Sequence, residues 1–290
     1  MKLLLKFNLV FLVVFLLGLA VSTLIADRLL SQAAKDEVID RARLLMRKAN
    51  AVSSYTAEEI KPLLETQMKY TFLPQSVPAF SAAEVLGKLQ KDYPDYAYKS
   101  AMLNPTNPRD RAVAWEADIV TQFKQHPEMA EFIGERDTPS GRSLYIARPI
   151  RITNPACLSC HTSPEMAPKP LVDRYGPANG FGWTLNDTLG VQVVSVPMTI
   201  PMAQAHRELL VVVGVLTGVF LLIGATLNFM LWRLVIRPVS RLSAIADRVS
   251  LGEFEAPEFG VKSKDEIGVL SESFGRMRTS LAHAMKMLDA

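Results

Sequence analysis

Two uncharged apolar runs constrain the fold of this chain more than any other feature of its sequence. The first, residues 9–25, reads LVFLVVFLLGLAVSTLI, and the second, residues 209–232, is 24 residues long with Thr and Asn as its only polar members. About 20 apolar residues cross the hydrocarbon core of a bilayer, so we predict a membrane helix over each run. A cleavable signal peptide is the alternative for the first run. That run exceeds a usual signal core, and no small-residue cleavage site stands out before Asp27.

Positive charges beside the two runs predict their orientation, because Lys and Arg are retained on the cytoplasmic side. Residues 1–8, with Lys2 and Lys6, precede the first run, and the second run is followed by Arg233, Arg237, Arg241 and Arg248. We therefore expect both termini to be cytoplasmic. Residues 26–208 then form one extracytoplasmic domain, and about 180 residues suffice for one ordinary core.

Charge and composition disfavour several other classes of protein. The chain has 49% hydrophobic residues, and its 32 Lys and Arg nearly cancel its 29 Asp and Glu, without a long basic run. This disfavours nucleic acid as a partner. Two cysteines cannot form the multi-bridge framework of a small secreted scaffold, and 15 Gly and 18 Pro are too few for a low-complexity chain.

Both cysteines fall in one segment, Cys157-Leu158-Ser159-Cys160-His161, which has the spacing for covalent attachment of a c-type haem. Residues three apart lie on one side of a helical turn, so both sulfurs can reach the vinyl groups of one porphyrin, and His161 can ligate the iron. A disulfide or a thioredoxin-like redox pair shares the Cys spacing but does not explain the histidine, and zinc needs a fourth ligand. We therefore predict one covalent haem c per chain, bound by Cys157, Cys160 and His161.

The second axial ligand of the iron stays open at this level. Met46 is one candidate, because it lies on the helix that continues outward from the first run, where ligation would couple the iron to the membrane. His126 is the alternative, since it is the histidine that the topology places best. An open or water-filled site that binds a small gas is equally allowed. Methionine is a usual haem ligand, and the other candidate thioethers are Met68, Met102, Met166, Met198 and Met202.

Many prolines and glycines surround the cysteines, which predicts an ordered loop that wraps a ligand. Three aromatic residues of this loop would supply apolar cover: Tyr175, Phe181 and Trp183. Four cations could neutralise haem propionates, although a solvated surface role is open for each: Arg148, Arg151, Lys169 and Arg174.

The rest of the extracytoplasmic domain reads as helices and a small antiparallel sheet. A helical stripe predicts a long helix packed against the domain or against a second copy, and its members are Val38, Ala42, Leu45, Ala49 and Val52. Pro62 and later prolines interrupt the next segment. Residues 117–133 read as a helix that Pro127 kinks or divides. Residues 144–152 and 189–196 read as strands flanking the haem loop, and Pro149 favours an edge position for the first.

Five segments occur in a characteristic order: YTAEEIKPLL, PQSVPAF, LNPTNPRD, ACLSCH and the closing GFGW…GVQVVSVPM. Together they resemble the family of extracytoplasmic c-type-haem domains with a PAS-like fold found at the front of bacterial membrane sensors, over residues 36–198. The resemblance implies an α+β, PAS-like fold that binds haem through Cys157 and Cys160, with His161 as axial ligand, in a periplasmic domain of the bacterial inner membrane. Some members take their other ligand from a cysteine of the first helix. This chain has no third cysteine, so Met46 on the corresponding helix is our substitute.

Residues 233–290 carry two further heptad stripes joined by residues 252–263. The first is Val235, Val239, Leu242, Ala246 and Val249, and the second is Ile267, Leu270, Phe274, Met277, Leu281, Ala284 and Leu288. Pro238, Gly252 and the segment DEIG look like the signature of a HAMP signal-relay module. A homodimer forming a parallel four-helix bundle would bury both stripes, whereas a coiled-coil tail that merely dimerises is the simpler alternative.

These features predict a two-pass, dimeric, membrane-bound haem-c sensor and not an enzyme. Iron redox state or a small ligand would change the haem pocket, and the HAMP dimer would relay the change to a separate cytoplasmic signalling protein. The alternative is a membrane-anchored c-type cytochrome for periplasmic electron transfer, which gives no reason for the HAMP-like tail. A haem enzyme such as a peroxidase would need an acid–base residue near the site, and none is identified.

Overall fold

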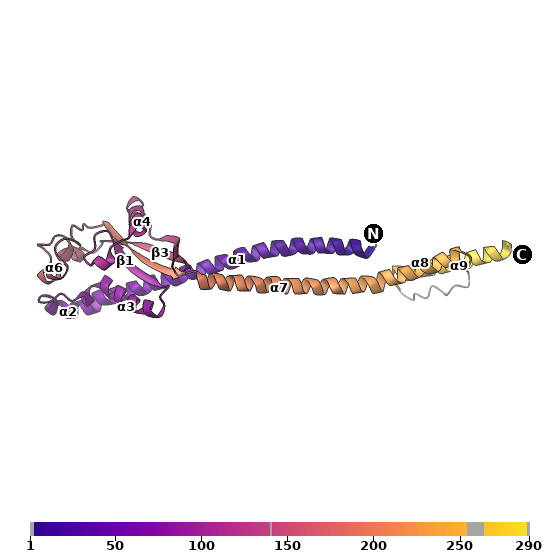
Figure 1. Cartoon of the computed structure of the whole chain (residues 1–290), viewed down its shortest axis with the longest axis horizontal. Helices are drawn as coiled ribbons and strands as arrows, with labels where there is room; N and C mark the ends of the chain where they lie inside the picture. Colours follow the sequence, from indigo (N-terminus) through magenta and orange to yellow (C-terminus); the bar gives the residue numbers. More distant parts are fainter. Residues whose placement is uncertain (1–2, 140, 254–263, 289–290) are drawn as a thin grey trace. The chain divides into compact units, whose positions relative to one another are not determined.

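The computed structural model describes residues 3–139, 141–253 and 264–288. Backbone contacts divide the chain into two units: residues 27–208 form one, and residues 1–26 with 209–290 form the other. The helices are α1 Leu3–Tyr55, α2 Lys61–Met68, α3 Pro78–Asp92, α4 Ala114–Gln125, α5 Leu158–His161, α6 Lys169–Tyr175, α7 Thr199–Met230, α8 Arg237–Ser250 and α9 Glu266–Leu288 (Figure 1). The strands are β1 Ala97–Met102, β2 Phe132–Thr138, β3 Gly141–Arg151 and β4 Thr188–Pro197. The mixed α+β class is confirmed.

The described part of residues 27–208 contains one antiparallel four-stranded sheet in the order β1-β4-β3-β2. Both predicted strands are present, as β3 and β4, and they pair with each other in the middle of the sheet. Side chains alternate between the two faces of a strand. Val194 and Val196 of β4 therefore pack on α1, while Val191 and Val193 pack on α4.

The part of α1 that follows Ala26 packs along one face of this sheet. Val38 and Ala42 are fully buried against Leu144 and Ile146, and Ala49 is buried against α3. The predicted apolar stripe is therefore confirmed, and it covers the sheet of its own domain. Each Å² of apolar surface that is buried stabilises the fold by roughly 25 cal/mol, so these contacts hold α1 on the sheet.

The expectations at Pro149 and Pro62 were wrong, and the one for residues 117–133 was wrong in part. The chain does leave the helix near Pro127, but its second part is a strand: α4 ends at Gln125, and Phe132 already pairs with Ala147 of β3. The reason is that Pro127 lacks an N–H and forces an extended conformation on the residue before it. β3 is also not an edge strand. Pro149 is tolerated because β2 pairs with β3 only as far as Ala147.

Pro62 does not interrupt the helix that it follows. A single π-helical segment, Thr56–Ile60, joins α1 to α2, and a second one, Leu231–Ile236, joins α7 to α8 ahead of Pro238. In both places the wider turn lies where a proline removes a backbone donor, so the chain stays helical.

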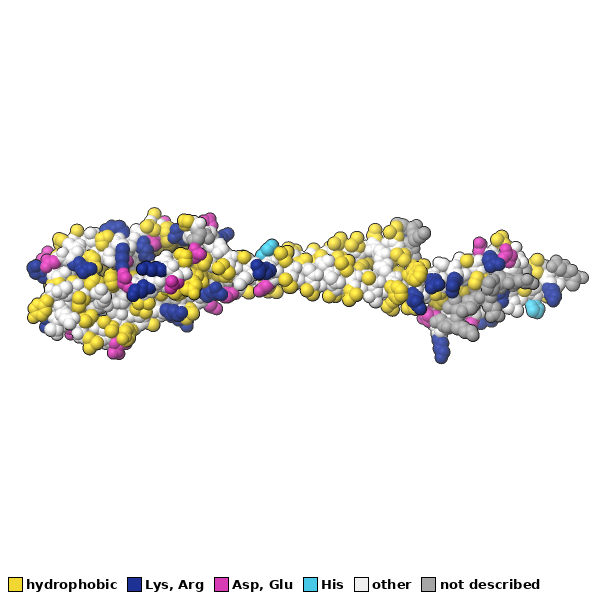
Figure 2. Space-filling view, turned by 60° about the horizontal axis from the view of Figure 1, so that its bottom comes forward, with side chains coloured by type: hydrophobic (Ala, Val, Ile, Leu, Met, Phe, Trp, Pro, Cys, Tyr) yellow, Lys and Arg dark blue, Asp and Glu magenta, His cyan; other side chains and the backbone are white. Residues whose placement is uncertain are grey.

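The other unit contains the two apolar runs. Within the described residues, two helices are long and apolar enough to cross a membrane, one beginning at Leu4 and one at Thr199. Hydrophobic and uncharged side chains cover their apolar stretches in Figure 2. The ring of Phe15 lies 4.6 Å from that of Phe220, and Gly224 leaves room for Phe11.

The two C-terminal helices carry the predicted stripes. α8 buries Leu242 and Val249, and the Asp265 carboxylate accepts the Gly268 N–H at 3.0 Å at the start of α9. Most of the connector, residues 254–263, lies outside the described residues, as does the side chain of Leu288.

Candidate functional site

The two cysteines lie on one short helical turn. The Asn154 side chain accepts the Ala156 N–H at 2.9 Å and caps the turn, while Pro155, with its fixed φ, begins it. The turn passes directly into α5, so Cys157 and Cys160 are one turn apart, and both are half-buried thiols. The spacing thus produces the local geometry that the sequence predicts.

His161, the last residue of α5, has its ring fixed by the chain around it. Its Nδ1 lies 2.7 Å from the carbonyl oxygen of Gly180. A carbonyl only accepts, so Nδ1 carries the proton and Nε2 keeps its lone pair for a ligand. Burial lowers the pKa of His161, and the bond to Gly180 opposes that shift only in part. The net lowering of the pKa favours the neutral imidazole that binds metal.

Residues 180–183 run back past α5 and pack against this imidazole. The Gly182 N–H donates to the carbonyl of Thr162 at 3.0 Å, and the Trp183 N–H donates to that of His161 at 3.2 Å. The indole of Trp183 consequently stacks on His161, with ring centroids 3.7 Å apart. Gly180 has φ +84°, and a Cβ there would lie 2.0 Å from Thr106 Oγ1, so the approach requires glycine.

The loop after β1 completes the site. Asn104 Oδ1 accepts the Gly180 N–H at 3.3 Å, and Asn104 Nδ2 donates to the Phe181 carbonyl at 3.4 Å. Thr106 Oγ1 lies 3.5 Å from His161 Nδ1. The segments LNPTNPRD, ACLSCH and GFGW, far apart in the sequence, therefore meet around one histidine.

A cavity of about 120 Å³ opens beside His161. Its wall is mainly apolar and aromatic and includes Phe72, Phe80, Leu171, Tyr175 and Trp183. His161 and the aromatic wall line the cavity, while Cys157 and Cys160 lie on the same helical turn as His161 and are not among the lining residues. Two thiols and a neutral imidazole are the donor set of a thioether-linked haem, so the donor set fits that group.

The structure does not bring Met46 or His126 to this cavity. Met46 is fully buried in the core cluster between α1 and the sheet, beside Val38, Ala42 and Val194. The His126 side chain is 58% exposed at the end of α4, with Nδ1 3.4 Å from the carboxylate of Glu128. Met102, at the end of β1, lines the cavity instead. The sequence does indicate that Met46 is buried, because Met46 lies four residues from Ala42 and therefore on the same helical face.

Of the predicted aromatic cover, Tyr175 and Trp183 line the cavity, and Phe181 lines a neighbouring pocket. The cations mostly have partners within the protein. Lys169 pairs with Asp173 at 2.8 Å, Arg151 donates to the carbonyl of Pro127, and Arg148 is bound by Glu131. The guanidinium of Arg174 lies 5.7 Å from the ring centroid of Tyr175, which lines the cavity.

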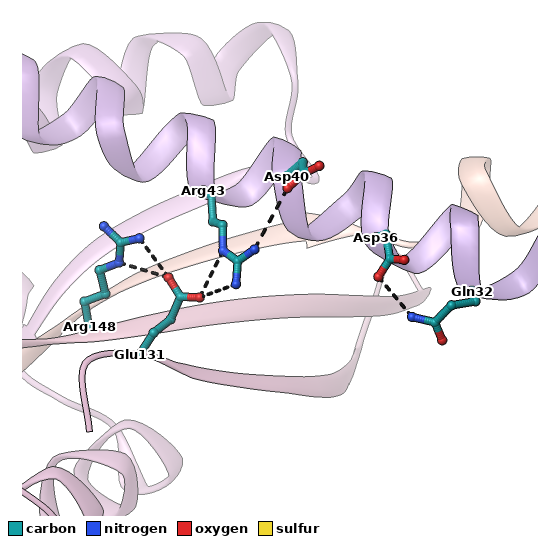
Figure 3. A network of polar contacts seen from close by, with 6 residues as sticks. All are labelled: Gln32, Asp36, Asp40, Arg43, Glu131 and Arg148. Carbon is teal, nitrogen blue, oxygen red and sulfur yellow. Dashed lines mark hydrogen bonds and ion pairs between the residues drawn. The ribbon is translucent and has the colours of Figure 1, made fainter. Parts of the chain in front are cut away.

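Glu131 joins the first helix to the strand that precedes the cysteines (Figure 3). Its Oε1 accepts from Nε and Nη2 of Arg43 on α1 at 3.1 and 2.9 Å, and its Oε2 accepts from Nε and Nη2 of Arg148 on β3 at 3.0 and 2.8 Å. Burial alone would raise the pKa of Glu131, but the two guanidinium groups outweigh it and lower the pKa. Each guanidinium thus donates two N–H groups to one carboxylate oxygen, and hydrogen bonds between charged groups are stronger than those between neutral groups.

Glu135 repeats this arrangement four residues along β2. It pairs with Lys35 of α1 at 2.9 Å and with Arg142 of β3 at 2.6 Å, and the hydrogen bond from Lys35 is the main reason that its pKa is lowered. Eight residues of helix and four of strand both span roughly 12–13 Å. We call Arg43–Glu131–Arg148 and Lys35–Glu135–Arg142 the two carboxylate clamps.

Parts of this chain are similar to known protein families. Residues 31–197 match the family model described as Tll0287-like, and residues 230–283 match the HAMP domain. A curated relative is the methyl-accepting chemotaxis protein TlpA of Bacillus subtilis (strain 168), which is 28% identical over 100 residues. That match covers 34% of this chain and spans only 14% of the relative's length. A solved structure, that of the cyanobacterial heme-protein Tll0287, is 15% identical, covers 56% of this chain and 95% of its own, and has a TM-score of 0.44.

Proposed function

This chain belongs to the Tll0287-like family, a family of haem-protein domains, and on that premise we propose that it is a membrane-bound haem-c sensor. The HAMP domain and the two membrane-length helices indicate a membrane signal-transduction protein. The observation that carries the finer assignment is the fixed imidazole of His161 beside Cys157 and Cys160. Its Nδ1 is bonded to Gly180, so that Nε2 keeps its lone pair, and His161 lines an apolar cavity.

In this proposal Cys157 and Cys160 hold one haem per chain. Both thiols would hold the haem covalently, and His161 would bind its iron through Nε2. The bound haem supplies a one-electron redox couple and an iron at which a small gas can bind. The chain's own residues orient the imidazole, through Gly180 and Trp183, and exclude water through the aromatic wall.

The strands on either side of the site supply a route for the signal. β3 leads into the cysteine turn, and β4 begins soon after Trp183 and continues into α7. The Ile152 N–H donates to the Asp187 carbonyl at 3.2 Å, and the Asn186 N–H donates to the Ile152 carbonyl at 2.8 Å, so the haem loop is closed at its base. A shift of His161 would thus reach α7 through β4, and α1 through β3 and the carboxylate clamps. A differential interaction of a few kcal/mol is enough to switch such a system.

The HAMP helices would complete the relay as a homodimer. In the single chain Leu270, Met277 and Leu281 of α9 stay about 40% exposed, at spacings of seven and four residues. A second copy would bury this stripe in a parallel four-helix bundle. We place residues 26–208 in the periplasm between membrane helices at 9–25 and 209–232. Residues 1–8 and 233–290 would then face the cytoplasm, where a separate signalling protein receives the output.

Mass spectrometry and absorption spectra of the full chain, made in a bacterium with cytochrome-c maturation, test this function. We expect one haem mass per chain. The double variant Cys157→Ala/Cys160→Ala should lose all covalent haem, whereas Ser159→Ala, between the two cysteines, should keep it. A wild-type chain without added haem mass would overturn the proposal.

The alternative, an electron-transfer cytochrome, is separated by removing residues 237–290. A sensor should lose its cellular response while its haem remains reducible, whereas a carrier should keep its function in the cell. The HAMP match favours the sensor, because electron transfer requires no such module.

A further inference from the structure

Met102 lies on the wall of the cavity that His161 lines, where sequence reasoning had favoured Met46. The described lining residues include one imidazole, that of His161, and one thioether, that of Met102. The other residues among them with polar side-chain atoms are Thr106, Asn107, Asp110, Tyr175 and Trp183. Iron in a cytochrome c is commonly held by a histidine and a methionine, so this wall presents both ligand types together.

The other thioethers considered for this role lie elsewhere. Met46 and Met198 are buried in the core cluster on the α1 face, and Met202 packs against that cluster. Met166 is 69% exposed, and Met68 is the last residue of α2. The structure therefore selects Met102 among the candidates.

The backbone of Met102 is held in place at the wall of the cavity. The Met102 carbonyl accepts the Ala112 N–H at 2.8 Å, and Met102 pairs with Gly190 across β1 and β4. A Cβ at position 190 would lie 2.3 Å from the Ala101 carbonyl oxygen, 2.9 Å from Met102 Cα and 3.0 Å from Met102 Cγ. Glycine at position 190 thus permits the close approach of β4 to β1 at Met102.

We infer that Met102 supplies the second axial ligand of the haem, opposite His161. This rests on the proposed function, since it requires haem attached at Cys157 and Cys160. The pairing of Met102 with Gly190 would connect this ligand to β4. A change in ligation at Met102 acts on β1 and on its partner β4, which continues into α7.

The test uses the full-length haem-loaded protein, with carbon monoxide as the probe. Wild-type ferric protein should show the sulfur-to-iron charge-transfer band. Met102→Leu, which keeps the volume of the side chain, should abolish the band, and the ferrous form should bind carbon monoxide at least tenfold faster. Met102→His should restore a six-coordinate spectrum with a lower reduction potential. The exposed control Met166→Leu should leave the band and the rate at wild-type values.

The outcomes separate this inference from the proposed function. A wild-type chain without covalent haem overturns both. Covalent haem whose ferric spectrum lacks the sulfur band, or retains it in Met102→Leu, overturns the assignment of Met102 alone. If Met102→Leu fails to fold, Met102→His still decides, because an unchanged spectrum and potential in that variant contradict ligation.

Discussion

The imidazole of His161 lies almost parallel to the indole of Trp183, with an angle of 11° between the ring planes. The pairing depends on backbone bonds of residues 180–183 to Thr162 and to His161 itself. One aromatic face of the histidine is therefore covered by protein, and rotation of the ring would break the stack as well as the bond to Gly180.

Replacing Trp183 should weaken the orientation of His161. We expect Trp183→Leu to lower the free energy of unfolding by about 1–2 kcal/mol, since aromatic pairs contribute roughly 0.5–1.5 kcal/mol beyond their buried area. Trp183→Phe keeps an aromatic plane and should lose less. Urea denaturation measures both, and equal losses in the two variants would contradict a role for stacking.

Gly180→Ala should destabilise the domain more than Gly176→Ala. Both glycines have positive φ, at +84° and +78°, so alanine is strained at each. At Gly176, where ψ is 170°, the conformation is essentially restricted to glycine and the strain is roughly 1–3 kcal/mol. At Gly180 the new Cβ also lies 2.8 Å from the Thr106 Cα, whereas at Gly176 nothing lies within 4 Å. Thermal unfolding of the two variants provides the comparison, and similar losses would show that the contact with Thr106 relaxes without cost.

Glu131→Gln should cost about 1–3 kcal/mol, the range for losing hydrogen bonds to charged groups. It removes the charge that Arg43 and Arg148 share. Asp40→Asn is the matched control, because the Asp40 carboxylate is 4.0 Å from Arg43 and 80% exposed, and we expect a change below about 0.5 kcal/mol. Equal losses in the two variants would show that Glu131 contributes no more than a surface charge.

Acid should release both carboxylate clamps. The pKa of Glu135 is lowered chiefly by its hydrogen bond from Lys35. The pKa of Glu131 is lowered because two guanidinium groups outweigh its burial. A carboxyl group with a lowered native pKa stabilises the fold above its ordinary value of 4.5, and that contribution disappears as pH falls through the native pKa. The stability difference between wild type and Glu131→Gln/Glu135→Gln should therefore be largest near neutral pH and shrink below pH 4.5. A difference that stays constant on acidification would contradict this account.

Met46 should behave as a core residue. Met46→Ala should cost about 2–5 kcal/mol and Met46→Leu less than about 1.5 kcal/mol, as for other buried large side chains. Because Met46 lies among Val38, Ala42 and Val194, Met46→Leu should leave the haem spectrum unchanged. A spectral change with little loss of stability would instead restore Met46 as a ligand candidate.

Sequence patterns predicted the parts of this protein that have strong periodicity or spacing. The two apolar runs form long helices, the α1 stripe, β3 and β4 bury apolar side chains, and the Cys157–His161 segment forms the expected turn. β1 and β2 escaped prediction because both are edge strands, and FIGERDT of β2 is half polar. Their strand conformation depends on pairing with β4 and β3, which a local pattern does not contain.

The ligand candidates could not be resolved without the tertiary structure. Met46 and Met102 are both methionines on regular elements, and what separates them is the cavity that one of them lines. Likewise the partners of Arg148 became visible only when Glu131 and Arg43 were brought together from distant positions. Spacing along the chain identifies groups that act within one turn, whereas contacts across the sheet require the fold.

A helix that is bound to a sheet at one point can rotate about that point, whereas a helix bound at two separated points cannot. With Lys35 and Arg43 both tied to the β2 edge, α1 cannot tilt on the sheet unless at least one of these ion pairs breaks. Bending or twisting of the strands should therefore change the direction as well as the position of residues 27–55 of this helix.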